Sequence, residues 1–554
     1  MSKAIALILL LFQAGNIFSQ QTVGLFANNA GSQNGYVLFA PIHSDTTYLI
    51  DKCGKQVNKW YSHNTPGLSV YLLADASLLH TGAKPNAVFN TNGSAGGVIQ
   101  RYDWNNNLLW SFTISDSLQT QDHDVCQLPN GNILVAVWEK INAATALASG
   151  RNPTLLGTEL WSAKIMELQP LGTNQANIVW QWRLWDHLIQ DFDSTRANYG
   201  IVADHPELVN LNYANNNNRD WIHLNAITYN ATLDQVMISA HALSEIWILD
   251  HSTSTGQAAG HSGGSHAKGG DLLYRWGNPA AYNRGTVSDQ TLFVQHNPNW
   301  IPANYKDGNN IAIFNNGTGR PTGNYSTVDI ITPPVDSNGN YSLVAGQPFG
   351  PVSAYWSYAA SVPTDFYSNN MGSAQRLSNG NTLICEAQKG NFFEIDSGKN
   401  IVWRYVNPVN DSGIIPQDVL ASQNMAFRCT LFEPTYSGFS GLTLAPGSPI
   451  QTDSLSASCT TVTEITGVSK EPEIQLKVIN PFYNRITVAS NADIENATVS
   501  LYDMRGREIR VWFNQNFYRE EANDLAVPEL ASGLYLLHIN SVHFNHTLKL
   551  IHQQ

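Results

Sequence analysis

Residues 128–135 read Leu-Pro-Asn-Gly-Asn-Ile-Leu-Val, a polar turn followed by an apolar run. Asn-Gly tolerates the positive φ angles of a two-residue hairpin, so the stretch predicts two antiparallel strands joined by a tight turn. Similar stretches begin at residues 307 and 377. A second recurring unit is a polar turn followed by a strand that ends in tryptophan, and it occurs at residues 54–60, 105–110, 174–180, 270–276 and 398–403.

These repeats, with the strand around residues 354–356, give about six units between about residues 36 and 435. Four-stranded units cannot close a hydrophobic core alone, but they can when they are arranged radially. We therefore expect an all-β fold with a six-bladed β-propeller over residues 20–445, in which residues 36–60 and 425–432 share the closing blade. A pair of two-sheet sandwiches is the alternative architecture.

The two ends of the chain differ from this repeat region in composition and sequence pattern. Residues 1–19 combine Lys3, an apolar run from Ala4 to Phe12 and the small residue Ser19, which predicts a signal peptide. No later stretch reaches about 18 apolar residues, so no integral membrane segment is expected. Residues 446–472 are rich in Ser and Thr and predict a linker. Alternating short strands in residues 473–554 predict a small C-terminal β-sandwich.

The charge balance limits the class of partner, and the cysteine content limits the number of disulfides. The chain has 30 Lys plus Arg against 43 Asp plus Glu, a formal net charge of −13. This charge repels a phosphate backbone, so nucleic acid is not expected as a partner. An oxidising compartment permits one or two disulfides among the five cysteines, but the sequence leaves their pairing open.

The C-terminal segment carries a set of motifs in a fixed order. These are Asn480-Pro481-Phe482, Leu501-Tyr502-Asp503 with Gly506 and Arg507, Ser532-Gly533-Leu534-Tyr535, and Lys549-Leu550. The segment resembles the C-terminal sorting domain of the Bacteroidetes type IX secretion system. The resemblance implies contact with that secretion machinery and a secreted or cell-surface location.

Three histidines occupy one position of the repeat. His123 lies five residues before Leu128, His223 five before Thr228, and His296 five before Ile301. The innermost strands of a propeller line its channel, so we expect these imidazoles to meet near the axis. Asn225 points to the same side of its strand as His223, and His241 ends the neighbouring strand. Imidazoles and an amide without a carboxylate pair suit an oxyanion better than a glycoside or peptide.

The motifs around these histidines resemble those of arylsulfate sulfotransferases. They are Asp220-Trp221-Ile222-His223-Leu224-Asn225, Gln295-His296, and Gln121-Asp122-His123-Asp124 with Leu128-Pro129-Asn130-Gly131. The resemblance implies a ping-pong transfer of a sulfuryl group from a phenolic sulfate to a phenol, without a nucleotide sulfate donor or other cofactor. It makes His296 the nucleophile, through a sulfohistidine. It also implies that His223, Asn225 and His123 hold the sulfuryl oxygens and handle the phenol proton.

Two positions depart from the family pattern. His241 stands where the family has an arginine, and Ser373 is the candidate replacement for a family threonine. Arginine is always charged and grips an oxyanion with two parallel donors, whereas histidine is charged only at low pH or beside an anion. We therefore expect weaker or more acid-dependent sulfate binding.

Two other readings of the histidines stay open. His123, His223, His241 and His296 could instead gather a transition metal for hydrolase, lyase or redox chemistry, since imidazoles suit Zn, Cu, Ni and Fe. A non-catalytic propeller that binds a glycan or protein is the other alternative. His251, His261 and His266 lie in or beside the Gly- and Ser-rich loop 252–270, which we expect to be a solvated loop because four ligands at defined spacing are absent.

Overall fold

The computed structural model describes residues 21–90, 96–213, 218–452, 459, 476–478, 480–504, 507–519, 521–541 and 545–553. The predicted signal peptide and most of the predicted linker lie outside these residues. The chain divides into two compact units, residues 1–461 and 462–554. The finer boundaries expected at residues 445 and 472 stay predictions.

The prediction of an all-β chain is confirmed. In the described part of unit 1, six antiparallel sheets of four or five strands hold most of the strands. The first three sheets, each in its order of pairing, are β29 (Ala426–Phe432), β2 (Tyr36–Pro41), β3 (Thr46–Asp51) and β4 (Gln56–Tyr61); β5 (Pro66–Leu72), β6 (Leu78–Ala83), β7 (Gly97–Tyr102) and β8 (Leu108–Thr113); and β9 (Gln119–Gln127), β10 (Ile133–Asn142), β11 (Glu159–Leu171) and β12 (Gln175–Arg183).

The next three sheets repeat this pattern. They are β15 (Leu224–Asn230), β16 (Gln235–Ala240), β17 (Glu245–Asp250) and β18 (Tyr274–Trp276); β19 (His296–Trp300), β20 (Ile311–Asn315), β21 (Thr327–Ile331) and β22 (Trp356–Tyr358); and β23 (Ser373–Arg376), β24 (Thr382–Glu386), β25 (Asn391–Ile395), β26 (Ile401–Val406) and β1 (Gly24–Asn28). Smaller elements between them are α1 (Ala143–Ala148), α2 (Thr255–Ala258), and the strand pairs β13 (Leu188–Ile189) with β14 (Val209–Asn210) and β27 (Val409–Asn410) with β28 (Gly413–Ile414).

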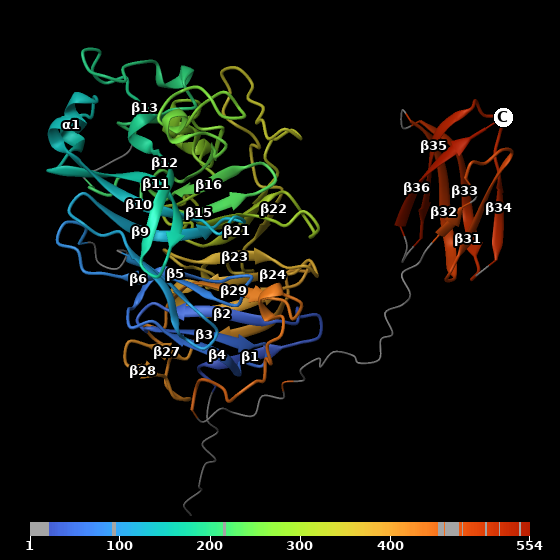
Figure 1. The fold of residues 1–554 in the computed structure, drawn as a ribbon, viewed down its shortest axis with the longest axis horizontal. Coiled ribbons are helices and arrows are strands. Elements are labelled where there is room, and N and C mark those ends of the chain that lie inside the picture. The colour runs from blue at the N-terminus through green and yellow to red at the C-terminus, as the bar shows by residue number, and fades with distance from the viewer. Residues whose placement is uncertain are drawn as a thin grey trace, which may run out of the picture. The chain divides into compact units, whose positions relative to one another are not determined.

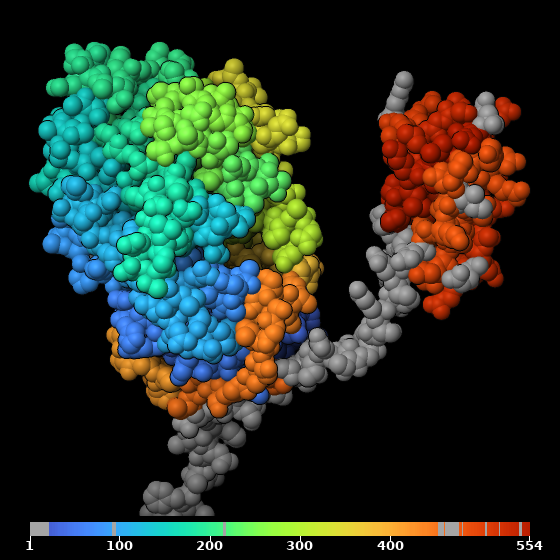
Figure 2. Space-filling view, viewed as in Figure 1, coloured from blue at the N-terminus to red at the C-terminus, as the bar shows by residue number. Residues whose placement is uncertain are grey.

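The first strand of each sheet belongs to a closed ring of contacts. In the order β29, β5, β9, β15, β19, β23, each strand contacts the next, and β23 contacts β29 again. We call these six strands the inner ring. β29 pairs with β2 as expected from the sequence, and the orange end of unit 1 lies against its blue beginning in both views (Figures 1 and 2). The inner ring therefore brings chain segments far apart in sequence to one place.

The turn predicted at residues 128–135 forms, but with a longer loop than expected. Leu128 N donates to Asn132 O at 2.8 Å, and Gly131 N donates to Leu128 O at 2.9 Å. Gly131 has a φ of 86°. Three residues therefore separate the strands, with the left-handed residue third, which is the next most common hairpin connection after the two-residue turns.

The recurring tryptophans join neighbouring sheets. The indole N–H of Trp60 on β4 donates to Asp103 O beyond β7, at 2.9 Å. Trp110 on β8 donates to Gln175 O on β12 at 2.9 Å. The same kind of bond runs from Trp276 to Pro351 and from Trp403 to Lys52, whereas Trp180 donates to the side-chain Oγ1 of Thr253, at 3.1 Å. The repeat seen in the sequence is thus a repeat of sheet-to-sheet contacts.

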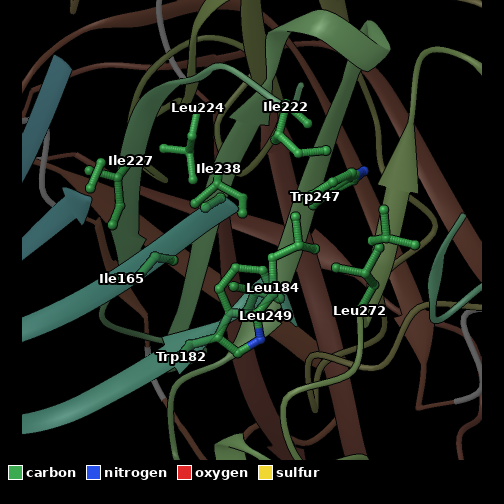
Figure 3. Close-up of a cluster of buried hydrophobic side chains, with 14 of the residues drawn as sticks. Ile165, Trp182, Leu184, Ile222, Leu224, Ile227, Ile238, Trp247, Leu249 and Leu272 are labelled. Atoms are coloured by element: carbon green, nitrogen blue, oxygen red, sulfur yellow. The ribbon is translucent and has the colours of Figure 1, made fainter. Parts of the chain in front are cut away.

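The largest hydrophobic cluster holds the third and fourth sheets together (Figure 3). Ile165 of β11 and Trp182 of β12 belong to the same cluster as Ile227, Ile238 and Trp247 of the fourth sheet. All five side chains are at most 1 % exposed. This packing fixes the two sheets that carry three of the candidate site histidines.

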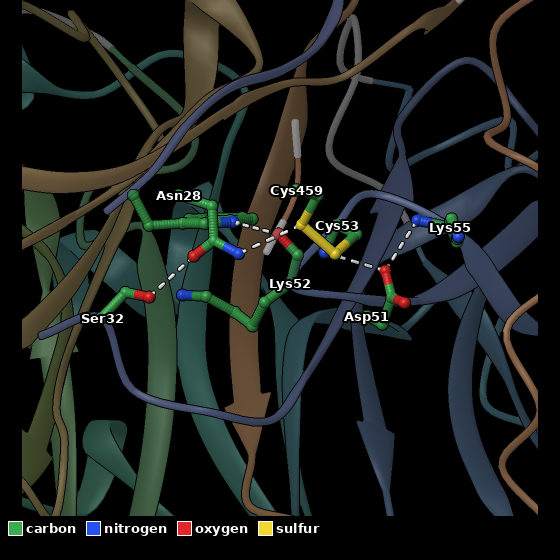
Figure 4. The surroundings of a disulfide bond; sticks show 8 residues. Asn28, Ser32, Asp51, Lys52, Cys53, Lys55 and Cys459 are labelled. Carbon is green, nitrogen blue, oxygen red and sulfur yellow. Dashed lines mark hydrogen bonds between the residues drawn. A yellow bond between two sulfur atoms is a disulfide. The ribbon is translucent and has the colours of Figure 1, made fainter. Parts of the chain in front are cut away.

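A disulfide joins Cys53, after β3, to Cys459, at a sequence separation of 406 (Figure 4). Asp51 Oδ1 accepts hydrogen bonds from the backbone N–H groups of Cys53 and Lys55, at 2.9 and 2.8 Å. Asn28 Nδ2 donates to Cys459 Sγ at 3.3 Å. The bond ties the far end of unit 1 to its first sheet.

Cys53→Ser is expected to lower the free energy of unfolding of unit 1 by about 2–4 kcal/mol, because the cross-link no longer restricts the unfolded chain. Denaturant unfolding without reductant measures the change. Cys126→Ser, which removes a free thiol, is the control and should shift the midpoint much less. Equal midpoints for Cys53→Ser and the unaltered protein would contradict the expectation.

The described residues of unit 2 form two antiparallel sheets around one core. One sheet orders β30 (Leu476–Val478), β31 (Arg485–Ser490) and β34 (Ala522–Ala526); the other orders β33 (Glu508–Phe517), β32 (Ile494–Asp503), β35 (Gly533–Asn540) and β36 (Asn545–His552). Val488, Val499 and Leu537 are fully buried in the shared cluster. Across all the residues described, no helix is long and apolar enough to cross a membrane.

Candidate functional site

Four histidines from three neighbouring sheets lie in one chain of ring contacts. His123 is in β9, His223 precedes β15, His241 follows β16, and His296 begins β19. Ring centroids are 4.5 Å apart for His123 and His223, 4.7 Å for His223 and His241, and 5.1 Å for His241 and His296. Phe427 of β29 lies 6.2 Å from both end rings. We call these four residues the histidine group.

The backbone departs from regular strand geometry where the histidines sit. His123 and His223 have φ angles of 45° and 52°, and Asn297, next to His296, has 47°. The ladders shift register beside them, between Leu224 and Ala226 and between His296 and Asn299. A left-handed non-glycine residue costs about 1–3 kcal/mol and persists where the surroundings over-determine it. In a regular strand, successive side chains alternate between the two faces. The irregularities change this alternation, and these side chains lie in one group.

Two members of the group contact acidic side chains through Nδ1, and burial raises the pKa of one of these acids, Asp122, well above its usual value. His123 Nδ1 contacts Asp122 Oδ1, and His223 Nδ1 contacts Asp220 Oδ2. Asp220 Oδ1 also accepts from His223 N, at 3.2 Å. A carboxylate on Nδ1 fixes the ring and directs Nε2 away from the carboxylate.

Burial and neighbouring charges give the rings different protonation states. Burial alone lowers the pKa of His223, but Asp220 and then Asp122 favour the imidazolium and raise that pKa from 6.5 to about 8. Burial, and then the charge of His223, lowers the pKa of His123 well below its usual value. The same two causes lower the pKa of His241 well below 6.5. At neutral pH the group therefore holds one imidazolium, His223, among neutral rings.

The tautomer of His296 is fixed by its two contacts. Asn316 Nδ2 donates to Ser368 O and Met371 O, at 2.8 and 2.7 Å, so its Oδ1 is the acceptor that faces His296 Nδ1, at 2.7 Å. Nδ1 therefore carries the hydrogen, and Nε2 accepts from Met371 N at 3.1 Å. Burial lowers the pKa of His296 well below its usual value, and this effect outweighs that of the hydrogen bond that His296 donates to Asn316, which raises the pKa. His296 is a neutral imidazole with its lone pair on Nε2.

The other two sequence candidates lie in different settings. Asn225 is fully buried, and its Nδ2 donates to Gln295 O at 2.9 Å. Its Oδ1 has no hydrogen-bond partner among the described residues. Ser373 is also buried, but its Oγ is engaged with the backbone of Cys429 on β29, at 3.3 and 3.4 Å. The segment just before β23 reaches His296 through Met371 N instead, and a role for Ser373 stays a prediction.

Comparison with known sequences identifies both units. Residues 43–414 match the family described as Arylsulfotransferase (ASST).

The chain belongs to the arylsulfotransferase family.

Residues 480–553 match the family described as secretion system C-terminal sorting domain, which indicates export to the cell surface or the medium. A search of curated proteins found no significant match.

Solved structures add little to the arylsulfotransferase assignment. A protein of unknown function from Bacteroides caccae is 12% identical, with a TM-score of 0.40, 72% of this chain covered and 99% of the other. Virginiamycin B lyase from Staphylococcus aureus is 9% identical, with a TM-score of 0.32, 70% of this chain covered and 89% of the other. A putative 6-phosphogluconolactonase from Bacteroides fragilis is 10% identical, with a TM-score of 0.34, 73% of this chain covered and 99% of the other. Likenesses this weak carry no argument about fold or function.

Sequence reasoning missed a buried cation in this arylsulfotransferase-family site. Arg428 of β29 forms an ion pair with Asp124 Oδ2 at 2.8 Å and donates to Tyr71 OH at 2.6 Å and to Asn225 O at 3.2 Å. Burial lowers the pKa of Arg428, but Asp124 and Tyr71 outweigh it, so the guanidinium stays charged. It links the inner-ring strands β29, β5, β9 and β15. The signal was hidden because Arg428 belongs to no repeated motif.

The metal alternative for the histidine group stays a prediction. Within the described parts of the chain, one set of three or more His, Cys, Asp or Glu side chains brings its ligand atoms within 4.8 Å of one another. That set is His187, His261 and Asp271, and it contains no member of the histidine group.

Proposed function

We propose that this chain is an exported arylsulfotransferase that moves a sulfuryl group from a phenolic sulfate to a phenol through a sulfohistidine at His296. The six sheets and their inner ring are proposed to be the blades of a six-bladed propeller, and the two sheets of unit 2 a β-sandwich. The observation that carries the function is the histidine group, in which a neutral imidazole and an imidazolium share one cluster in a chain of this family.

We assign the role of nucleophile to His296. Its Nδ1–H is held by Asn316 Oδ1 at 2.7 Å, so the lone pair is on Nε2. In the first half-reaction Nε2 attacks sulfur, the N–S bond forms, and the bond between sulfur and the phenolic oxygen breaks. The Met371 N–H that now contacts Nε2 at 3.1 Å has to move aside for this attack.

His223 fits the part of general acid and base. With a pKa of about 8 it is protonated at neutral pH and can give its Nε2 proton to the leaving phenolic oxygen. In the second half-reaction an acceptor phenol gives that proton back to His223 while its oxygen attacks sulfur. The N–S bond then breaks, and His296 returns to its starting state. Atoms and protons balance over the two steps.

The positive charges of His223 and Arg428 support binding of the anionic sulfate. The side chain of His223 is 24% exposed, so the imidazolium is accessible from solvent. Arg428 is held deeper, with a side chain that is 10% exposed. A buried cation acts more strongly on a nearby anion than the same cation in water, because the surrounding dielectric is low.

A chromogenic aryl sulfate with a phenol acceptor tests the proposal. We expect phenol release that depends on the acceptor, formation of the sulfated acceptor, and a protein species heavier by one SO₃ group when the acceptor is left out. Release at the same rate without any acceptor, with no SO₃-modified protein, would exclude the ping-pong route.

His241→Arg should strengthen sulfate binding. The pKa of His241 is held well below 6.5 by burial and by His223, so the residue brings no charge at neutral pH. A hydrogen bond to a charged group contributes about 1.5–3 kcal/mol, so kcat/KM for an aryl sulfate should rise about 10- to 100-fold, mainly through a lower KM.

The matched control is His241→Gln, which is also neutral and should leave kcat/KM within a few-fold of the original. An arginine that leaves KM unchanged, or a glutamine that abolishes activity, would contradict this account of position 241.

The proposed route of export combines both ends of the chain. Residues 1–19 act as the signal peptide for the first membrane, and the sorting domain is recognised by the secretion machinery in the second step. The tail then serves as an export handle, and removing residues 473–554 should leave the propeller in the cell.

A further inference from the structure

Outside the histidine group, three side chains from two chain segments converge on one point. His187 follows β12, His261 lies in the loop between α2 and β18, and Asp271 lies just before β18. His187 Nδ1 and His261 Nδ1 both face Asp271 Oδ1, each at 2.8 Å. All three ligand atoms lie within 4.8 Å of one another.

The contacts of His187 leave a lone pair facing the carboxylate. His187 Nε2 lies 2.8 Å from Ala258 O, which can only accept, so Nε2 carries a hydrogen. The Nδ1 of neutral His187 then has no hydrogen, and two lone pairs face each other at 2.8 Å. Either a proton or a metal ion must lie between them. A histidine that donates its second N–H to a backbone carbonyl is the usual arrangement for a metal ligand.

The surroundings hold these side chains in place. His187 is fully buried and stacks on Trp182, with ring centroids 5.7 Å apart. Trp182 Nε1 donates to Gly270 O at 2.7 Å, and a Cβ on Gly270 would lie 2.6 Å from His187 Nε2. Leu184 and Leu272 anchor the flanking chain segments in the hydrophobic cluster (Figure 3).

We propose that His187 Nδ1, His261 Nδ1 and a carboxylate oxygen of Asp271 bind a divalent transition metal of the Zn²⁺ class. Imidazole nitrogen favours such ions over Ca²⁺ and Mg²⁺, which need more oxygen ligands. Tetrahedral bonds of about 2.0–2.1 Å separate ligand atoms by about 3.3 Å, so each histidine Nδ1 needs to move about half an ångström away from Asp271 Oδ1. The side chain of His261 is 61% exposed, which leaves the remaining coordination position open to water.

The ion would connect two sheets at their outer side. His187 follows the last strand of the third sheet, and His261 and Asp271 precede the last strand of the fourth. A metal that binds the folded chain alone stabilises it by mass action. The site therefore predicts a zinc-dependent rise in thermal stability, independent of sulfuryl transfer.

The test uses the protein without a polyhistidine tag, stripped of metal by a chelator. Zn²⁺ affinity is measured by competition with a chromophoric chelator, and the melting temperature is measured with and without Zn²⁺. We expect micromolar or tighter binding, a higher melting temperature with Zn²⁺, and little response to Ca²⁺. His261→Gln should weaken Zn²⁺ binding at least about 10-fold and remove the thermal shift.

Controls separate this site from other histidines. His261→Gln alters a largely exposed side chain, and Asp271→Asn provides a second variant of the same site. His43→Gln removes an exposed histidine elsewhere and should leave binding unchanged. Three results would overturn the proposal: no binding below about 100 µM, equal binding by His261→Gln and the unaltered protein, or binding lost in His241→Gln but kept in His261→Gln. The first means that a proton, not an ion, lies between His187 and Asp271, and the third places the ion in the histidine group.

Discussion

Replacing His296 with alanine should lower sulfuryl transfer by about 10⁴- to 10⁶-fold, because the residue that forms the covalent intermediate is gone. The remaining cations can still bind the sulfate, so KM should change far less than kcat. Steady-state phenol release gives the rate. Mass spectrometry of protein mixed with donor alone should find no SO₃-modified species in His296→Ala.

A companion variant separates the nucleophile from its support. Asn316→Ala keeps the Nε2 of His296 but removes the acceptor that fixes the tautomer at 2.7 Å. It should lose activity by about 10- to 100-fold and still form the SO₃-modified protein. Phenol release and SO₃ modification that survive in His296→Ala would rule out this residue as the nucleophile.

Asp220→Asn should have the second largest effect, a fall in kcat of about 10²- to 10³-fold at neutral pH. The carboxylate of Asp220 opposes the effect of burial and holds the pKa of His223 at about 8. Without it, burial dominates and the pKa falls below 6.5, so the general acid is deprotonated at pH 7. Asparagine keeps an oxygen for the 3.2 Å bond from His223 N, so the local backbone is retained.

The pH profile distinguishes the loss of the Asp220 carboxylate from a loss of folding, because a loss of folding would not move the alkaline limb of the profile. In the unaltered protein kcat should fall as pH rises through about 8, because the protonated form of His223 is the active one. In Asp220→Asn that fall should move below pH 6.5. The loss should be larger for an unactivated phenyl sulfate than for a nitrophenyl sulfate, whose leaving group needs less help from an acid.

Glu207→Gln is the matched control, because Glu207 pairs with the exposed His205 at 2.9 Å, outside the histidine group. Its pH profile should equal that of the unaltered protein. An Asp220→Asn profile with its alkaline limb still near pH 8 would show that His223 does not act as the proton donor.

Much of the fold could be predicted because its signals are local. The Asn-Gly turn at residues 130–131 and the spacing of tryptophans such as Trp60 and Trp110 depend on neighbouring residues in the chain, which the sequence displays. The loop length at residue 128 was predicted one residue too short, since Asn-Gly fits both kinds of hairpin. The disulfide between Cys53 and Cys459 could not be predicted, because its partners meet only when the chain end returns to the first sheet.

For the candidate site, too, some features could be predicted from the sequence and others depend on the tertiary structure. The sequence by itself determined that His123, His223 and His296 occupy one position of the repeat, because repeat position is a property of the chain, and their roles in the chemistry stay a prediction. Only the tertiary structure decided their states. Asn316 and Met371 fix the tautomer of His296, and Arg428 reaches the site from the closing strand. Protonation depends on burial and on charges a few ångströms away, and those distances exist only after the inner ring has closed.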